Sequence, residues 1–246
     1  MRLTPGIARI HAHICGDGCV YISREKRSLA SLIKHPRKKL DVNQYIIEYY
    51  NKCNELLNEF KKDMEKEFSR KASYSPKKFR LRIRGAKHII EKLEVQSKNS
   101  RNWVVPNYIS SSSLEIIKNW LRAFFDDEST VDVQRKRIRV KLMNKLALIQ
   151  ISFLLSKLKI DSRITGQNID GSWYLNVPKD YLRTYQMEIG FLHPQKKDKL
   201  EKLVGRGGFS KIFEPPTPRS SAVCSPRLSY RPLMSIYFII LFKSFL

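Results

Sequence analysis

One order of elements occurs twice along this chain of 246 residues. In each copy an apolar helix ends in acidic residues, strands follow, and a second helix opens on Asn-Lys, at Asn51 and at Asn144. The interval between the acidic end and the Asn-Lys pair is longer in the first copy, where a basic loop spans residues 24–39. The pattern predicts a divergent internal duplication, with similar α/β halves at residues 1–105 and 106–213.

Apolar periodicity predicts the elements of each half. In the first half we expect helices at residues 7–15, 51–68 and 86–93, and strands at residues 19–23, 44–50 and 78–84. In the second half, Ser112 or Ser113 is expected to cap a helix that ends in Asp126-Asp127-Glu128. Further helices are expected to open at Asn144, near Lys179 and near Pro194, and strands at residues 130–133, 136–142, 162–167 and 172–177.

Cations alternate with apolar residues in one predicted strand of each half. Because a strand has a period of two, the cations share one face and the apolar residues share the other. An acid-free basic face of this kind favours contact with nucleic acid, although a solvated sheet face gives the same pattern. The predicted DNA-contacting residues are Lys78, Arg80, Arg82 and Arg84 in the first half, and Arg135, Arg137, Arg139 and Lys141 in the second.

The charge of the chain supports this interpretation. Lys and Arg number 47 against 23 for Asp and Glu, a formal net charge of +24, while 42% of the residues are apolar. That apolar fraction supports a packed core and excludes a disordered basic tail. A polyanionic partner is therefore expected, with nucleic acid first and an acidic membrane surface second.

The four cysteines form no dense framework, which favours an intracellular setting. Residues 214–246 are rich in Pro and Ser, which predicts a linker or disordered tail. The apolar run at residues 233–246 is shorter than the ~20 residues that a membrane-spanning helix needs. No membrane association is expected.

Acidic residues at the ends of the two leading helices point to a metal ion. Asp17 and Glu128 occupy equivalent places, and a helix C-terminus already carries partial negative charge. A divalent cation such as Mg²⁺, which prefers oxygen ligands, is the natural partner for such a pair. A solvated acidic loop is the alternative. Ala8, Ala12 and Gly16, with Ala123 on the second helix, are small enough to let the two helices approach closely.

Residues 10–18 (IHAHICGDG) and 121–129 (LRAFFDDES) resemble the two nine-residue motifs of the LAGLIDADG homing endonucleases. The sequence Trp103-Val104-Val105-Pro106 before the second motif and residues 189–194 near the end add to the resemblance, which covers residues 3–205. The eighth position of each motif, the catalytic carboxylate of that family, falls on Asp17 and Glu128. His11, His13 and Ser129 depart from the usual motif.

The resemblance implies an α/β (α+β) fold with two pseudo-symmetric αββαββα halves. Each half would lend a saddle-shaped antiparallel sheet to a long DNA site, and the halves would join at the motif helices. The implied activity is Mg²⁺-dependent hydrolysis of both DNA strands by a monomer, with Mn²⁺ as a possible substitute. Asp17 and Glu128 would bind the metal, and Asn51, Lys52, Lys141 and Asn144 are auxiliary candidates.

A second function remains open at this stage, an intron-RNA-binding maturase in which cleavage is lost or secondary. A transcriptional regulator that reuses the scaffold is less favoured, because both carboxylates are present. His11, His13, Cys15 and Cys19 do not make a convincing zinc site, since residues two apart on a helix point to different faces. The sequence contains no hydrolase triad context, Walker phosphate loop or intact intein junctions.

Overall fold

The computed structural model describes residues 2–26, 41–95 and 103–205. These residues belong to one compact unit, Met1–Gly208, and a second unit comprises Phe209–Leu246. Most of the predicted basic loop and the whole predicted tail at residues 214–246 lie outside the described residues. The fold below is that of the first unit.

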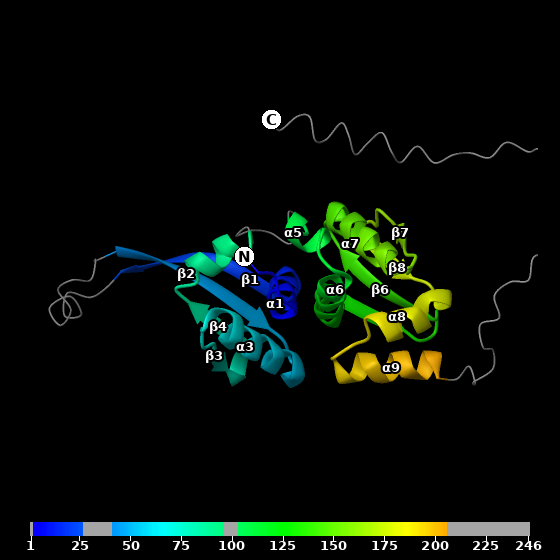
Figure 1. Cartoon of the computed structure of the whole chain (residues 1–246), viewed down its shortest axis with the longest axis horizontal. Helices are drawn as coiled ribbons and strands as arrows, with labels where there is room; N and C mark the ends of the chain where they lie inside the picture. Colours follow the sequence, from blue (N-terminus) through cyan, green and yellow to red (C-terminus); the bar gives the residue numbers. More distant parts are fainter. Residues whose placement is uncertain (1, 27–40, 96–102, 206–246) are drawn as a thin grey trace, which may run out of the picture. The chain divides into compact units, whose positions relative to one another are not determined.

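The first half begins with a helix and ends with a helix (Figure 1). In chain order its elements are α1 (Pro5–Cys15), β1 (Gly18–Lys26), β2 (Asp41–Tyr50), α3 (Asn54–Phe68), β3 (Ser73–Ser75), the 3₁₀ turn η1 (Pro76–Lys78), β4 (Arg80–Arg84) and α4 (Lys87–Lys92).

The second half repeats this order after a short helix. Its elements are α5 (Asn107–Ser110), α6 (Leu114–Glu128), β5 (Ser129–Asp132), β6 (Arg137–Leu142), α7 (Lys145–Lys157), β7 (Arg163–Thr165), β8 (Trp173–Val177), η2 (Lys179–Tyr181), α8 (Leu182–Glu188) and α9 (Pro194–Val204).

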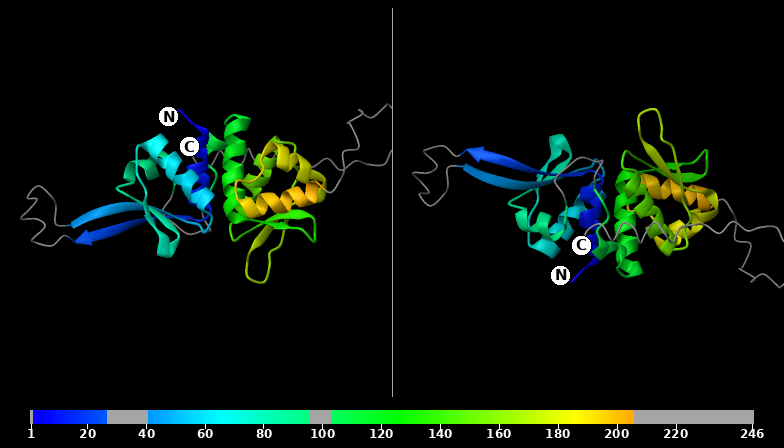
Figure 2. Two further views of the ribbon diagram at one scale, coloured as in Figure 1. Left: turned by 90° about the horizontal axis from the view of Figure 1, so that it is seen from below. Right: turned by 90° about the horizontal axis from the view of Figure 1, so that it is seen from above.

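The two halves carry sheets of identical topology. Each described sheet has four antiparallel strands, in the order β1-β2-β4-β3 in the first half and β5-β6-β8-β7 in the second. The strands of the β1–β2 hairpin are longer than those of the β5–β6 hairpin, as Figure 2 shows. The mixed helix and antiparallel-sheet fold predicted from the sequence is confirmed, and the shared strand order supports the internal duplication.

Local chemistry sets the helix boundaries. The Thr4 hydroxyl accepts a hydrogen bond from Ile7 N at 3.2 Å, and Pro5 occupies the first turn of α1. Asn144 caps α7 in the same way, with its side chain accepting from Ala147 N at 3.0 Å. Ser113 is the N-cap residue of α6, but its hydroxyl makes no capping hydrogen bond, so the predicted serine cap is confirmed only in position.

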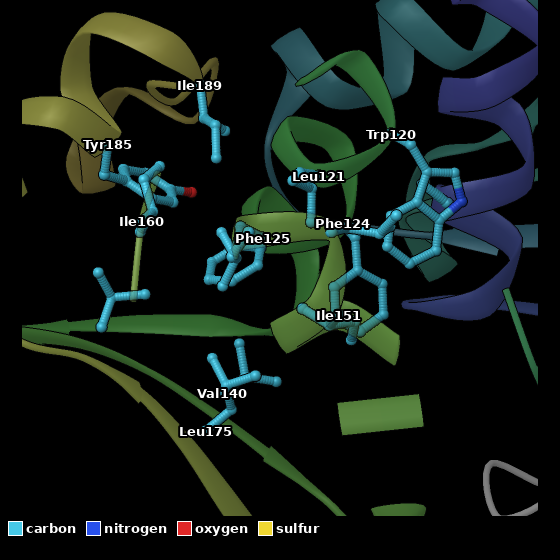
Figure 3. Close-up of a cluster of buried hydrophobic side chains, with 14 of the residues drawn as sticks. Trp120, Leu121, Phe124, Phe125, Val140, Ile151, Ile160, Leu175, Tyr185 and Ile189 are labelled. Atoms are coloured by element: carbon cyan, nitrogen blue, oxygen red, sulfur yellow. The ribbon is translucent and has the colours of Figure 1, made fainter. Parts of the chain in front are cut away.

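Two apolar cores lie on either side of the motif helices. The second core contains Trp120 stacked on Phe124, with ring centroids 5.1 Å apart, and Figure 3 shows side chains of α6 over the second sheet. Helix α1 contributes to both cores. Its isoleucines pack in the first core, whereas Ala8 and Ala12 pack in the second. Small residues therefore do face α6, as predicted.

None of the described helices is both long enough and apolar enough to span a bilayer. The cysteines of the described residues, Cys15, Cys19 and Cys53, are free thiols.

Candidate active site

Helices α1 and α6 pack directly against each other and end at the same place (Figure 1). They are in tight contact at Gly16, where an added Cβ would lie only 2.8 Å from the Cβ of Asp127. Gly16 and Asp127 occupy equivalent positions, one before the predicted catalytic carboxylates. The contact therefore brings Asp17 and Glu128 to one end of the helix pair.

A pocket of about 420 Å³ opens at this end. Its lining mixes carboxylates with cations from both halves of the chain. The lining residues are Asp17, Tyr50, Asn51, Lys52, Lys78, Phe79, Asp126, Asp127, His193 and Lys196. Glu128 does not line this pocket, although its charge interacts with that of Asp17.

Asp127 has hydrogen-bond partners on both carboxylate oxygens. Its side chain is fully buried, with Oδ2 lying 2.9 Å from His13 Nδ1 and Oδ1 accepting from the Tyr49 hydroxyl at 2.7 Å. The Asn51 amide donates to the same Oδ1 at 3.2 Å and to Asp17 Oδ2 at 2.9 Å. Asp127 and Asp17 are therefore joined through one carboxamide.

Burial and the charges of neighbouring carboxylates raise the pKa values of the two predicted catalytic carboxylates. Loss of solvent raises the pKa of Asp17 to about 6, and the charge of Asp127 adds to this effect. Loss of solvent, with the charges of Asp17 and Asp127, raises the pKa of Glu128 to about 7. Carboxylates that repel each other in this way gain stability from a nearby cation. The prediction that the two helix ends meet is supported by these interactions.

The last helix supplies a cation to this end of α6. Lys196 Nζ donates to the carbonyl oxygens of Phe125 at 3.0 Å and Asp126 at 2.5 Å. Carbonyl groups at a helix C-terminus have no partner within the helix, so a lysine there satisfies them. Asp126 in turn accepts from the backbone N–H groups of Leu192 and His193, which holds the start of α9 against α6.

Further from the pocket, partly buried ion pairs lie around the contact between α1 and α6. Glu59 of α3 accepts two hydrogen bonds from Arg122 of α6, at 2.6 and 2.8 Å. Arg9 of α1 makes a bidentate pair with Asp63 of α3, at 2.7 and 2.8 Å. These pairs join both motif helices to α3. Bidentate geometry makes them stronger than ordinary surface ion pairs.

The two histidines of the first motif are interfacial, and they do not converge on a metal. Burial lowers the pKa of His11 to about 3, and its Nδ1 accepts from Trp120 Nε1 at 3.1 Å. Burial would also lower the pKa of His13, but Asp127 and Glu59 outweigh it and raise that pKa to about 9. His11 is therefore neutral and His13 charged at neutral pH.

The prediction of an acid-free basic face in the first sheet is wrong. Glu48 of β2 is buried opposite Arg82 of β4, forming ion pairs with Arg82 and, at 2.9 Å, with Arg80. Leu81 and Ile83 are buried on the other face, as alternation predicts. Arg84 is exposed and lines a second pocket of about 390 Å³ on this sheet.

The basic face of the second sheet also contains acids. Arg137 pairs with Asp132 at 3.4 Å, and Lys141 pairs with Asp170 at 2.5 Å. Arg139 differs, because its guanidinium stacks over the Tyr174 ring at 4.6 Å, which restricts its orientation.

Two of the predicted strand cations lie outside the strands. Lys78 ends the 3₁₀ turn η1, and the next residue, Phe79, adopts φ of 47° and is exposed. Lys78 therefore lines the carboxylate pocket instead of the sheet. Arg135 lies in the turn between β5 and β6. Strand β6 begins at Arg137, one residue later than predicted.

Of the four auxiliary candidates, two line the carboxylate pocket and two do not. Asn51 and Lys52 line the carboxylate pocket. Asn144 does not, because its side chain caps α7 and donates to the Trp103 carbonyl at 2.6 Å. Lys141 lies in the second sheet and donates a hydrogen bond to Asp170.

Reasoning from the sequence missed residues that line the pocket and one, Tyr49, that bonds to Asp127 beside it. Asp127 was visible as part of the acidic triplet, and Lys196 and His193 lie beside a segment noted for its resemblance. Tyr49 had no sequence signal, because a tyrosine near the end of a strand is common.

The donor set fits a hard divalent cation that is completed by substrate oxygens. Among the described residues, no group of three or more His, Cys, Asp or Glu side chains is arranged as a metal cage. Asp17 and Glu128 offer carboxylate oxygens whose pKa values are raised by burial and by neighbouring carboxylates. Mg²⁺ is commonly held by one or two carboxylates together with phosphate oxygens and water.

Comparison with known proteins matches this geometry. A family model described as a LAGLIDADG-like domain matches residues 115–190. Homing endonuclease I-ApeI of Aeropyrum pernix is 30% identical over 108 residues, which cover 42% of this chain and 48% of that protein. The crystal structure of I-DmoI in complex with DNA and Ca is 17% identical with a TM-score of 0.54, covering 80% of this chain and 98% of that one.

Residues 115–190 are thus similar to a LAGLIDADG-like domain, and the chain shares the fold of I-DmoI. A further relative is the DNA-directed RNA polymerase subunit Rpo1C of Methanocaldococcus jannaschii, 27% identical over 110 residues, which cover 45% of this chain and 13% of that protein. The matched region spans less than half the length of each curated relative described here. The likeness to I-DmoI supports the same fold across both halves of the chain.

Proposed function

We propose that the protein is a site-specific endonuclease that hydrolyses both strands of a long DNA site and depends on Mg²⁺. The observation that carries the proposal is the meeting of Asp17 and Glu128 at the ends of two packed helices, between two sheets that carry cations. I-DmoI, which has the same fold, has been crystallised with DNA and Mn and with DNA and Ca.

Asp17 and Glu128 would hold the divalent cation, with Mn²⁺ as a substitute, and DNA phosphate oxygens would complete its coordination. A bound divalent cation supplies charge stabilisation at the phosphate and lowers the pKa of bound water. Hydrolysis adds water across one phosphodiester bond in each strand.

Cations of the pocket would place the DNA backbone beside the carboxylates. Lys52, Lys78 and Lys196 line the pocket together with Asp17. Lysine is suited to phosphate as a compact point charge, and such contacts fix position without reading sequence.

The sheets would supply the remaining contacts. Arg139 is the strongest candidate for reading a base, because stacking on Tyr174 restricts its guanidinium, and arginine can donate two hydrogen bonds to guanine. Arg80 and Arg82 are held by Glu48, so we assign them mainly to shaping the sheet surface.

Cleavage of host DNA tests this function. Purified full-length protein is incubated with Mg²⁺, with or without EDTA, and with host DNA that carries an intron-free copy of the gene whose intron would encode this protein. New DNA ends are then sequenced. One recurrent break that requires Mg²⁺ is the expected result. Asp17→Asn should abolish the break yet keep DNA affinity within a few fold, because it removes a metal ligand and not a DNA contact.

Cutting retained by Asp17→Asn would remove Asp17 from the proposed site. No break with any DNA, together with tight and salt-sensitive binding to the parent intron RNA, would replace the endonuclease with the maturase.

A further inference from the structure

We propose that Asp127 and His13 form a buried positioning pair that acts through the Asn51 carboxamide to hold the Asp17 carboxylate in place. The inference rests on the endonuclease function proposed above and goes beyond its two metal-binding carboxylates. It assigns a role to His13, which departs from the usual motif, and to Asp127, which precedes Glu128.

Asn51 has no spare hydrogen-bonding hydrogen in this arrangement. Its Oδ1 accepts from Cys53 N at 2.9 Å, which fixes the orientation of the carboxamide. Its Nδ2 carries two hydrogens and donates to Asp17 Oδ2 at 2.9 Å and to Asp127 Oδ1 at 3.2 Å, with the Tyr49 hydroxyl as a longer contact at 3.4 Å. Asn51 therefore acts on the Asp17 carboxylate instead of on a water molecule.

Asp127 is held as firmly as the carboxamide it contacts. The side chains of Asp127 and His13 are both fully buried. The two oxygens of Asp127 contact His13 Nδ1 at 2.9 Å and the Tyr49 hydroxyl at 2.7 Å. His13 also contacts Glu59 at 3.5 Å, which links it to the ion pairs of α3. A buried carboxylate with partners on both oxygens keeps one orientation, so it can orient Asn51.

Nothing equivalent serves Glu128. The counterparts of His13 and Asp127 in the opposite motif are Phe124 and Gly16, which offer no polar side chain. Asn144, the counterpart of Asn51, is occupied by the cap of α7 and the Trp103 carbonyl. Among the described residues no side chain donates a hydrogen bond to Glu128. The positioning device is therefore present at one of the two carboxylates.

Asp127→Asn is the central variant, because it keeps the shape of the side chain and removes its charge. Asp63→Asn is the control, since it breaks a partly buried ion pair between α1 and α3 that does not reach Asn51. We expect Asp127→Asn to slow cleavage ~10- to 100-fold, as loss of a partner that orients a metal ligand does, with DNA affinity unchanged. Asp63→Asn should cut at the wild-type rate at temperatures where it is folded.

Plasmid cleavage under single-turnover conditions separates the two strands. Since the device serves only Asp17, Asp127→Asn should accumulate nicked circles, with one cut slowed more than the other. Equal slowing of both cuts, or the same behaviour in Asp63→Asn, would overturn the proposal.

A double-mutant cycle tests whether Asp127 acts through Asn51. Asn51→Ala combined with Asp127→Asn should be no slower than Asn51→Ala alone, because the second change removes the support of a group already absent. Additive losses would show that Asp127 acts by another route. Tyr49→Phe, which removes one hydrogen bond to Asp127 without opening a large cavity, gives a smaller effect in the same direction and serves if Asp127→Asn does not fold.

The side-chain amide signal of Asn51 gives a readout that needs no cleavage. In ¹⁵N NMR spectra we expect its two protons to exchange slowly in the wild type and in Asp63→Asn, and faster in Asp127→Asn. Unchanged exchange in Asp127→Asn would overturn the positioning role even if no DNA were cut. Absence of cleavage by the wild type, with the expected change in exchange, would instead refute only the endonuclease function.

Discussion

Replacing Gly16 with alanine should destabilise the protein by about 2 kcal/mol, the middle of the range for overpacking a tight contact. The added Cβ would lie 2.8 Å from the Cβ of Asp127 and 2.9 Å from its Oδ2. Carbon atoms pack best at roughly 3.5–4.0 Å, so α1 and α6 would have to separate by most of an ångström. Asp127 is held by His13 and Tyr49 and cannot move aside without losing those bonds.

Thermal unfolding followed by circular dichroism measures this cost. For a unit of this size, about 2 kcal/mol corresponds to a fall in Tm of roughly 4–8 °C. Gly6→Ala in the same helix is the control. Its added Cβ meets the Oε1 end of Glu67, a flexible side chain that can move, and alanine favours a helix over glycine by about 0.5–1 kcal/mol. A Gly16→Ala protein as stable as Gly6→Ala would refute the tight helix contact.

Two further predictions concern charge. Because the pKa of His13 is raised to about 9, its charged form stabilises the fold below pH 6.5 and this stability is lost as the pH rises through 9. Chemical unfolding should show a decline between pH 7 and 9 in the wild type that His13→Gln lacks. Glu48→Gln should release Arg80 and Arg82 and lower the stability of the fold. In a plot of log binding constant against log salt concentration, the slope for DNA binding should steepen by about one. An unchanged slope would contradict the ion-pair assignment.

Local patterns predicted the elements well, because each depends on neighbours in sequence. Isoleucine spacing in α1 and cation–apolar alternation in β4 lead directly to the observed burial. The errors come from partners distant in sequence. Glu48 neutralises Arg80 and Arg82 from the adjacent strand, and alternation within β4 contains no information about β2.

The candidate site was predicted in outline and missed in detail. Asp17 and Glu128 followed from the motif resemblance and from the poor electrostatics of acids at helix ends. The role of Asp127 depends on which of three consecutive acids faces His13 of α1. Only the packing of α6 on α1 decides that. Asn51 and Asn144 look equivalent in sequence, yet one contacts a carboxylate and the other caps a helix.

The bonds of Lys196 to the end of α6 bear on incomplete copies of this protein. A chain that stops before α9 retains both motif carboxylates and every strand of the two described sheets. It lacks the cation that satisfies the carbonyl oxygens of Phe125 and Asp126, and the backbone groups that hold Asp126. Such a fragment would leave the end of α6 without these partners, directly beside the two proposed metal ligands. On the proposed function, early termination would therefore damage the carboxylate pocket and leave the strands of both sheets in the chain.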